Sequence, residues 1–268
     1  MSGRTRLLST LATVNLLTWA GLLPAGMGVA APDSPGSPRG ELYQVAGYRP
    51  PANLGKPPTT GGGSRGETCD RLSNLEGASI PITALVPKSA TSEPDWALTV
   101  SDRPDFYVYV PPTPAREAEF VLRDEEWNEV YRTSLAIDGA AGIVRVAMPK
   151  SAAPLELGKN YRWHFALICP PGQQGSADDI SVVEGWTRRQ SVDDTLAAAL
   201  KQATTPREIA EAYAQNGIWH DALTTIATQL QQSPEDQASR EEWQDLLASA
   251  GLTQFGNLSY LWNSGETP

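Results

Sequence analysis

The chain has 268 residues, of which 40% are hydrophobic, and a formal net charge of −10, so it can form one or two domains with a hydrophobic core. Proteins that bind nucleic acids or anionic lipids carry clusters of Lys and Arg, whereas the one dense basic spot in this acidic chain is Arg188-Arg189. The composition therefore argues against a nucleic-acid or membrane-surface partner.

Residues 1–30 have the form of a secretory signal peptide. Arg4 and Arg6 precede an apolar run at residues 7–23, and the small residues at 28–31 supply a cleavage site. An uncleaved anchor is the alternative, but the run is shorter than the roughly 20 apolar residues that a membrane span needs. We expect an exported protein, periplasmic or secreted, with no membrane span after signal removal. Cleavage would remove two arginines and no acid, which takes the net charge from −10 to −12.

Residues 31–74 are rich in Pro and Gly, and we interpret them as a flexible linker because such a segment cannot form a core. The glycine-rich stretch at residues 61–66 lacks the Gly-Lys-Ser/Thr ending of a phosphate-binding loop. It therefore predicts no nucleotide site.

The two cysteines, Cys69 and Cys169, form a pairable number in an oxidising compartment, and we expect a disulfide between them. The alternative is two buried free thiols. Two cysteines and two histidines are too few to indicate a zinc site.

Residues 75–190 show the two-residue period of short β-strands, and we predict an all-β, immunoglobulin-like sandwich. In the segment 161–168 the apolar side chains alternate with Arg162 and His164, which assigns one core face and one solvent face. Residues 106–110 are apolar on both faces. Either Tyr107 and Tyr109 are covered by the helical segment, or they are exposed as a contact patch. The expected strands are 80–86, 97–100, 106–110, 118–123, 130–135, 143–148, 161–168 and 181–188.

Residues 191–268 return to a helical period and predict a small all-α segment. Within it, residues 205–236 resemble one tetratricopeptide-type helical hairpin: Thr205 begins a capping box, Gly217 ends the first helix, and Trp219 and Leu223 share an apolar stripe on the second. A lone unit cannot bury its own apolar face. The hairpin must therefore pack on its own chain or on a partner. The remaining tail is too apolar to stay in water, so we expect it to dock.

We identify no catalytic, cofactor-binding or metal-binding residue in the sequence. Neither His164 nor His220 has a nucleophile and an acid at a recognisable spacing. The acidic turns 124–126 and 178–179 fit solvated charges better than a glycosidase or calcium site. Trp127, beside the first of these turns, is the tryptophan best placed to contact a ligand. The candidate binding surface consists of Tyr107, Tyr109, Trp127, Trp219 and His220.

Several motifs lie along nearly the whole chain after the signal. They are Gly62-Gly63-Ser64-Arg65-Gly66, Phe106-Tyr107-Val108-Tyr109-Val110-Pro111, Glu119-Phe120-Val121-Leu122, Val130-Tyr131-Arg132-Thr133, Tyr161-Arg162-Trp163, Val183-Glu184-Gly185-Trp186 and Gly217-Ile218-Trp219. Together these motifs resemble a family of exported proteins of unknown function, found mainly in cyanobacteria. The resemblance implies no established activity, cofactor or catalytic residue.

These observations favour binding over chemistry. The first hypothesis is a non-enzymatic protein-interaction or adaptor module that meets a protein partner in the cell envelope through the helical hairpin. The second is a domain that binds carbohydrate or another envelope polymer through Tyr107, Tyr109 or Trp127. A hydrolase built on the acidic turns is the weakest of the three.

Overall fold

The computed structural model describes residues 47–51, 80–88, 96–168, 180–257 and 261–264. The predicted signal peptide, most of the predicted linker, both cysteines and the acidic turn 178–179 lie outside these ranges. No helix among the described residues is long and apolar enough to cross a membrane.

Strands come first along the described chain and helices follow, as the change of period predicts. A strand lies in each of the eight expected segments, although only residues 83–84 of the segment 80–86 form one, and the expected helices are present. A short strand at residues 261–264 was not predicted. The strands are β1 (Thr83–Ala84), β2 (Trp96–Thr99), β3 (Asp105–Val110), β4 (Glu117–Asp124), β5 (Glu129–Ala136), β6 (Gly142–Ala147), β7 (Asn160–Ile168), β8 (Ile180–Arg189) and β9 (Leu261–Ser264). The helices are α1 (Asp194–Gln202), α2 (Pro206–Gln215), α3 (Trp219–Gln232) and α4 (Gln237–Ser249), followed by a 3-10 turn, η2 (Thr253–Phe255).

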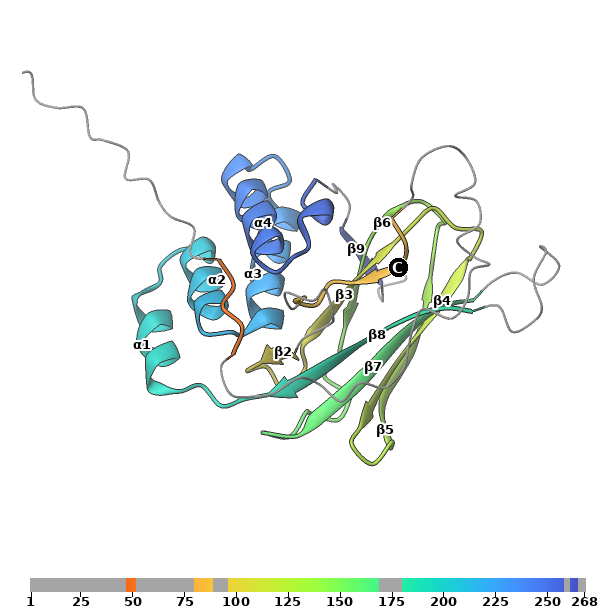
Figure 1. Ribbon diagram of the computed structural model, residues 1–268, viewed down its shortest axis with the longest axis horizontal. Helices are drawn as coiled ribbons and strands as arrows, with labels where there is room; N and C mark the ends of the chain where they lie inside the picture. Colours follow the sequence, from red (N-terminus) through yellow and green to blue (C-terminus); the bar gives the residue numbers. More distant parts are fainter. Residues whose placement is uncertain (1–46, 52–79, 89–95, 169–179, 258–260, 265–268) are drawn as a thin grey trace, which may run out of the picture. The chain divides into compact units, whose positions relative to one another are not determined.

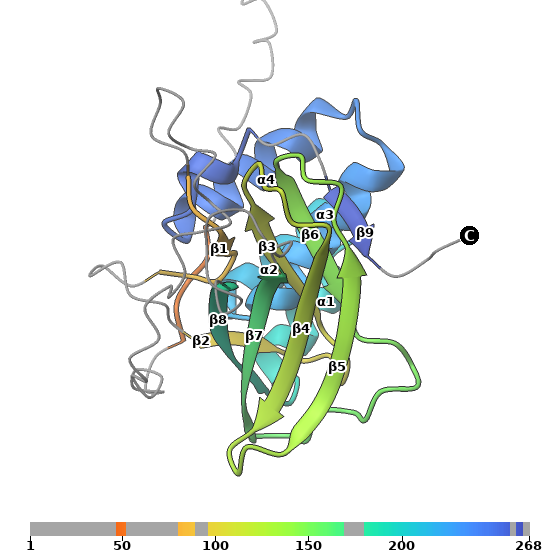
Figure 2. The same ribbon diagram turned by 90° about the vertical axis from the view of Figure 1, so that its right-hand side faces the viewer.

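The strands form two sheets with the orders β1-β3-β6-β9 and β2-β8-β7-β4-β5 (Figures 1 and 2). Most neighbours are antiparallel, whereas β2 runs parallel to β8 and β9 runs parallel to β6. Rings from both sheets meet between them: the Phe106 ring on β3 lies 4.9 Å from that of Phe120 on β4 and 5.5 Å from that of Trp163 on β7. The main core therefore lies between the two sheets.

Strand β7 shows how alternation places side chains on the two faces. Tyr161, Trp163, Phe165 and Leu167 are all buried, as the two-residue period predicts. Arg162 and His164 take the opposite face, where Trp186 and Glu184 of β8 are their register partners.

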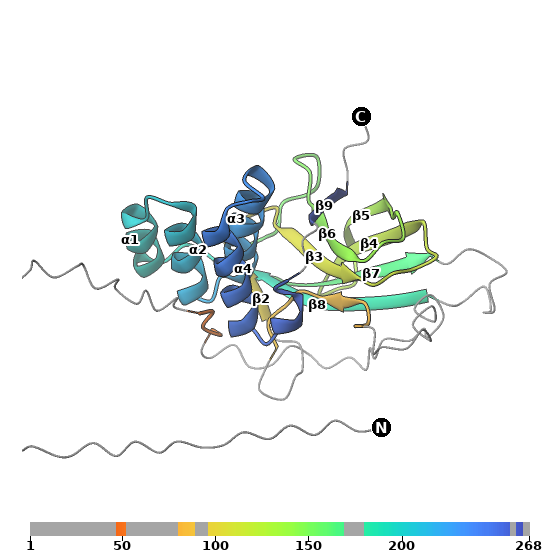
Figure 3. The same cartoon turned by 90° about the horizontal axis from the view of Figure 1, so that it is seen from above.

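Strand β3 is buried on both faces because helices cover the side that points away from the other sheet (Figure 3). The Tyr107 hydroxyl lies 3.4 Å from the Thr224 hydroxyl on α3, and the Tyr109 ring lies 5.1 Å from that of Phe255. Of the two alternatives for these tyrosines, the structure takes the covered one. Phe255 also shows that the tail docks as expected.

The hairpin α2–α3 packs against strands of its own chain. Its ends form as the sequence predicts, with a capping box between Thr205 and Glu208 and a left-handed Gly217 at φ 74°. The Trp219 indole donates a hydrogen bond of 2.8 Å to the Leu85 carbonyl, and Leu223 is fully buried. Since the apolar stripe of α3 is used inside the molecule, it offers no free docking face.

Candidate functional site

The five residues of the expected binding surface do not come together. Tyr107, Tyr109, Trp219 and His220 are buried, so none of them can form a flat patch for a partner. Trp127 is the exception, with 57% of its surface exposed. Two places remain to be compared as sites: the surroundings of His220 and the surroundings of Trp127.

His220 joins helix α3 to both sheets. Its Nδ1–H donates to the Asp105 carbonyl on β3 at 2.9 Å, because a carbonyl can only accept. Its Nε2 therefore accepts from the Thr187 hydroxyl on β8, also at 2.9 Å. Burial lowers the pKa of His220 to about 4, although the bond to Asp105 opposes that shift. The ring is thus neutral at neutral pH, and neither nitrogen is free to act as a base.

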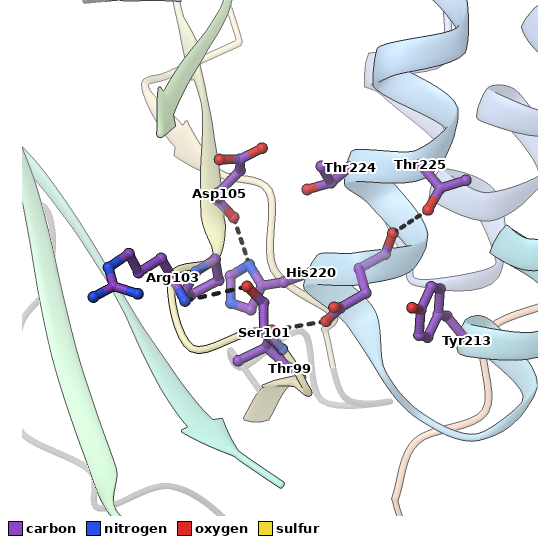
Figure 4. Close-up of a pocket in the computed structure, with 10 residues that line it drawn as sticks. Thr99, Ser101, Arg103, Asp105, Tyr213, His220, Thr224 and Thr225 are labelled. Carbon is purple, nitrogen blue, oxygen red and sulfur yellow. Dashed lines mark hydrogen bonds between the residues drawn. The ribbon is translucent and has the colours of Figure 1, made fainter. Parts of the chain in front are cut away.

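Beside His220 lies a polar pocket of about 170 Å³ between the β2–β3 connection and helices α2 and α3 (Figure 4). Asp221, in the first turn of α3, accepts hydrogen bonds from the Thr99 hydroxyl at 2.7 Å and the Val100 amide at 3.1 Å. The Thr225 hydroxyl donates to the Asp221 carbonyl at 2.7 Å. These bonds fasten the helix to the end of β2.

Two carboxylates of this pocket are partly removed from water. Burial raises the pKa of Asp105, while the ion pair with Arg145 at 2.6 Å acts to lower it. Burial also raises the pKa of Asp221, against hydrogen bonds from Thr99 and Val100. The Ser and Thr hydroxyls that line the pocket and both ring nitrogens of His220 form hydrogen bonds within the protein. The pocket therefore connects α3 to the strands and does not have the features of a reactive centre. Within the described ranges, no three His, Cys, Asp or Glu side chains gather as metal ligands would.

Trp127 stands at the tip of a β4–β5 turn that Asp124 holds in place. The Asp124 carboxylate accepts from the Glu126 amide at 3.0 Å and from the Asn128 amide at 2.9 Å, and Lys159 lies 3.1 Å away. Desolvation acts to raise the pKa of Asp124, but the bonds from Asn128 and Lys159 prevail and lower it to about 2. Trp127 adopts φ 68°, the left-handed region that a bulky residue rarely takes.

Trp127 also ends a row of tryptophans and arginines on the outer face of the five-stranded sheet. The Arg162 guanidinium lies 5.3 Å from the centre of the Trp127 ring and 5.8 Å from that of Trp186. The Trp186 ring meets Trp96 edge-on at 5.8 Å, and Arg188 lies 4.9 Å over Trp96. We call these five residues the tryptophan–arginine ladder. Sequence alternation placed Arg162 on this face, but only the pairing of β7, β8 and β2 brings the ladder together.

Exposed apolar side chains gather in segments at the same end of the sheet. There β4 ends opposite the start of β7, and Leu157 bridges to Arg189 at the end of β8 (Figure 2). Trp127 belongs to the turn after β4, while Leu157 (59% exposed) precedes β7. The Lys159 ammonium lies here among three carboxylates, at 3.1 Å from Asp124, 3.3 Å from Glu126 and 3.7 Å from Glu156. This end of the sheet is the best candidate for a contact surface.

The fold defines a two-sheet β protein with a C-terminal helical part and an exposed tryptophan at one end of its five-stranded sheet. Residues 60–259 match the family described as Domain of Unknown Function (DUF928), and the chain belongs to that family. The match runs through both the strands and the helices.

No curated protein matches the chain. Among solved structures, it is similar to the fn3 domain of the human collagen alpha-1(XX) chain, with 13% identity, coverage of 55% of this chain and 97% of that one, and a TM-score of 0.25. It is also similar to a Parabacteroides merdae β-glucuronidase, with 9% identity, coverage of 69% of this chain, and a TM-score of 0.23. The chain spans only 28% of that enzyme's length. Likeness at this level carries no argument about function.

Proposed function

We propose that this protein is a non-enzymatic binding module that docks a protein partner outside the cytoplasm through the surface around Trp127. The exposure and backbone conformation of Trp127 carry this proposal. A left-handed backbone costs a bulky residue about 1–2 kcal/mol, and exposing the ring forgoes the gain from burying it. Folding alone does not account for a tryptophan at this position.

The chemistry of the surface fits a protein partner. Tryptophan is enriched among the residues that dominate protein–protein binding energy. Arg162 is buried and lies against the Trp127 ring, so it supports the ring from within the protein. The bonds to Asp124 hold the turn in one conformation, which lowers the entropy cost of docking. The helical hairpin contributes indirectly, because α3 anchors strands through Trp219 and His220. We propose that the fold is an immunoglobulin-like sandwich with a tetratricopeptide-like hairpin, supported by the aromatic contacts between the sheets and by the capped α2–α3 pair.

The location outside the cytoplasm rests on the form of residues 1–30. An oxidising compartment would also allow Cys69 and Cys169 to pair, and we propose that they do. Thiol titration of the purified mature protein, with and without reductant, tests this pairing. Two reactive thiols under native oxidising conditions would refute it.

A glycan is the second candidate partner, since an exposed tryptophan ring can also stack on a sugar. An enzymatic role has less support. Asp124 accepts hydrogen bonds from Glu126, Asn128 and Lys159. Both nitrogens of His220 are also hydrogen-bonded within the protein.

The test compares three forms of the mature protein in crosslinking and pull-down from the native envelope: wild type, Trp127→Ala, and the matched control Ile168→Ala. Ile168 is also exposed, but it lies at the opposite end of β7. We expect wild type and Ile168→Ala to capture the same partner, and Trp127→Ala to lose it. Equal capture by all three forms would refute this surface.

The same proteins are applied to glycan arrays and to hydrolase substrates. Trp127-dependent glycan binding without protein capture would establish the second candidate. Turnover that disappears when Asp124, Glu125 and Glu126 are replaced together would identify an enzyme instead.

A further inference from the structure

We infer that the group which the partner places on Trp127 is a cation, and specifically an arginine guanidinium. This inference rests on the proposed function, because Trp127 is the centre of the proposed surface. It adds the chemistry of the partner's contact residue, which the exposure of Trp127 alone leaves open.

The contacts within the tryptophan–arginine ladder favour a guanidinium on Trp127. Every tryptophan in it meets a guanidinium or a second ring: Arg188 lies over Trp96, and Arg162 lies between Trp186 and Trp127. A guanidinium is attracted to the face of an indole ring by the ring's quadrupole. At Trp127 the ladder stops, and more than half of the side chain remains exposed. Three of the four contacts in the row join an indole ring to a guanidinium, and the fourth joins two rings. An arginine of the partner would repeat, on the exposed surface of Trp127, the contact that this face of the sheet uses most.

The negative charge around the β4–β5 turn also favours a cation. Lys159 is shared by Asp124, Glu126 and Glu156, so these four side chains have a net charge of −2. Glu126 and Glu156 keep 62% and 75% of their side-chain surfaces exposed. Arg162 forms an ion pair with Glu184, so its charge does not neutralise these carboxylates. A cation that contacts Trp127 would thus also meet the local excess of negative charge.

Arginine fits this position better than lysine. A guanidinium is planar and weakly hydrated, so it can stack on the indole and donate two parallel hydrogen bonds to a carboxylate at the same time. An ammonium is a compact, strongly hydrated charge that gives up more hydration at such a contact. An acidic partner is excluded by repulsion from the carboxylates.

The test uses a synthetic capped peptide of alternating Gly and Arg, titrated into the mature protein while the indole N–H signals are followed by NMR. Its matched control replaces each Arg with citrulline, which keeps the shape and removes the charge. Trp127→Leu, which keeps an apolar side chain but has no ring, assigns the Trp127 signal. We expect the Arg peptide to shift that signal, and the citrulline peptide to bind about tenfold more weakly.

Further variants separate the two arguments. The double variant Glu126→Gln/Glu156→Gln should weaken the Arg peptide several-fold and reduce the salt dependence of binding, whereas Ile168→Ala should leave it unchanged. Trp127→Leu should lose the Arg peptide while keeping the wild-type fold. Equal binding of the Arg and citrulline peptides, or binding of the Arg peptide that survives Trp127→Leu, would overturn the inference.

Competition distinguishes failure of the inference from failure of the proposed function. Capture of the partner that depends on Trp127 but is not displaced by the Arg peptide would leave the proposed function standing and refute the cationic contact. Capture that is indifferent to Trp127 would refute the proposed function, and the inference with it, whatever the peptide does.

Discussion

The α2–α3 hairpin and the β4–β5 turn each place a tryptophan beside a tightly built turn, and the two side chains meet opposite surroundings. Trp219 is fully buried and its indole bonds to the Leu85 carbonyl. Trp127 is mostly exposed and its ring meets a guanidinium. The difference lies in the neighbours. Trp219 begins an apolar stripe that must be buried against other side chains. Trp127 follows three acidic residues, and their hydration keeps that turn at the surface. Whether each tryptophan is buried or exposed is therefore determined by the polarity of the neighbouring residues in the same element.

The strongest test of the buried side of this comparison is Leu223→Ala. Leu223 is fully buried on the same stripe as Trp219, so truncation should lower the free energy of unfolding by about 2–5 kcal/mol. Thermal and denaturant melts measure the loss. Leu157→Ala, at an exposed side chain, is the control and should change stability by less than about 0.5 kcal/mol. An unchanged melting point for Leu223→Ala would show that the hairpin does not pack as described.

The buried His220 predicts how the free energy of unfolding changes as the pH falls. Its pKa is about 4 in the folded protein against 6.5 for the free side chain, so below pH 6.5 the unfolded chain takes up a proton that the folded protein does not. The contribution of the neutral, buried His220 to the free energy of unfolding is therefore fully present above pH 6.5. As the pH decreases from 6.5 toward 4, the free energy of unfolding should fall by about 1.4 kcal/mol per pH unit.

The measurement compares denaturant melts of wild type and His220→Gln between pH 7 and pH 4, where the difference isolates His220 from the nearby carboxylates. Burial raises the pKa of Asp105 and Asp221, and those groups favour the folded state as the pH falls. A stability difference that is the same at both ends of the range would contradict a neutral, buried His220.

Trp219→Phe sharpens the comparison by removing one hydrogen bond and part of a buried ring. An aromatic ring remains, but the buried Leu85 carbonyl loses its indole donor, which should cost about 1–3 kcal/mol. The smaller ring also leaves a cavity at this fully buried position, which adds to the loss. Trp127→Phe at the exposed turn is the paired control, and we expect it to melt like the wild type. Equal melting points for the two variants would show that the indole–carbonyl bond contributes nothing.

The smallest expected effect is the most specific to Trp127. Trp127→Gly removes a bulky side chain from a left-handed position, so we expect stability to stay the same or rise by up to about 1 kcal/mol. Partner capture should be lost at the same time. A variant that unfolds at a lower temperature would mean that the tryptophan supports the fold, and its exposure would then not indicate a binding role.

Local sequence signals determined most of the secondary structure. The alternation of apolar and polar residues identified the core face of β7. The capping box between Thr205 and Glu208 formed as predicted, and Gly217 ended α2 in the left-handed conformation. Each of these depends on residues within a few positions of one another, so the sequence contains the full interaction. The period also showed that helices follow strands. It did not predict β9, whose strand conformation depends on pairing with β6 across more than one hundred residues.

Tertiary structure alone decided which of the candidate residues meet solvent. Tyr107 and Tyr109 could have faced water or helices, and only the packing of α3 and Phe255 settled the matter. His220 was expected on the candidate binding surface, yet it is buried and its two hydrogen bonds reach strands β3 and β8. The tryptophan–arginine ladder joins strands that are distant in the chain, so no local pattern reveals it. The sequence by itself determined the elements and the faces they must bury, because those depend on local backbone preference and side-chain polarity; which faces meet, and which tryptophan is left at the surface, depended on how the two sheets and four helices pack together.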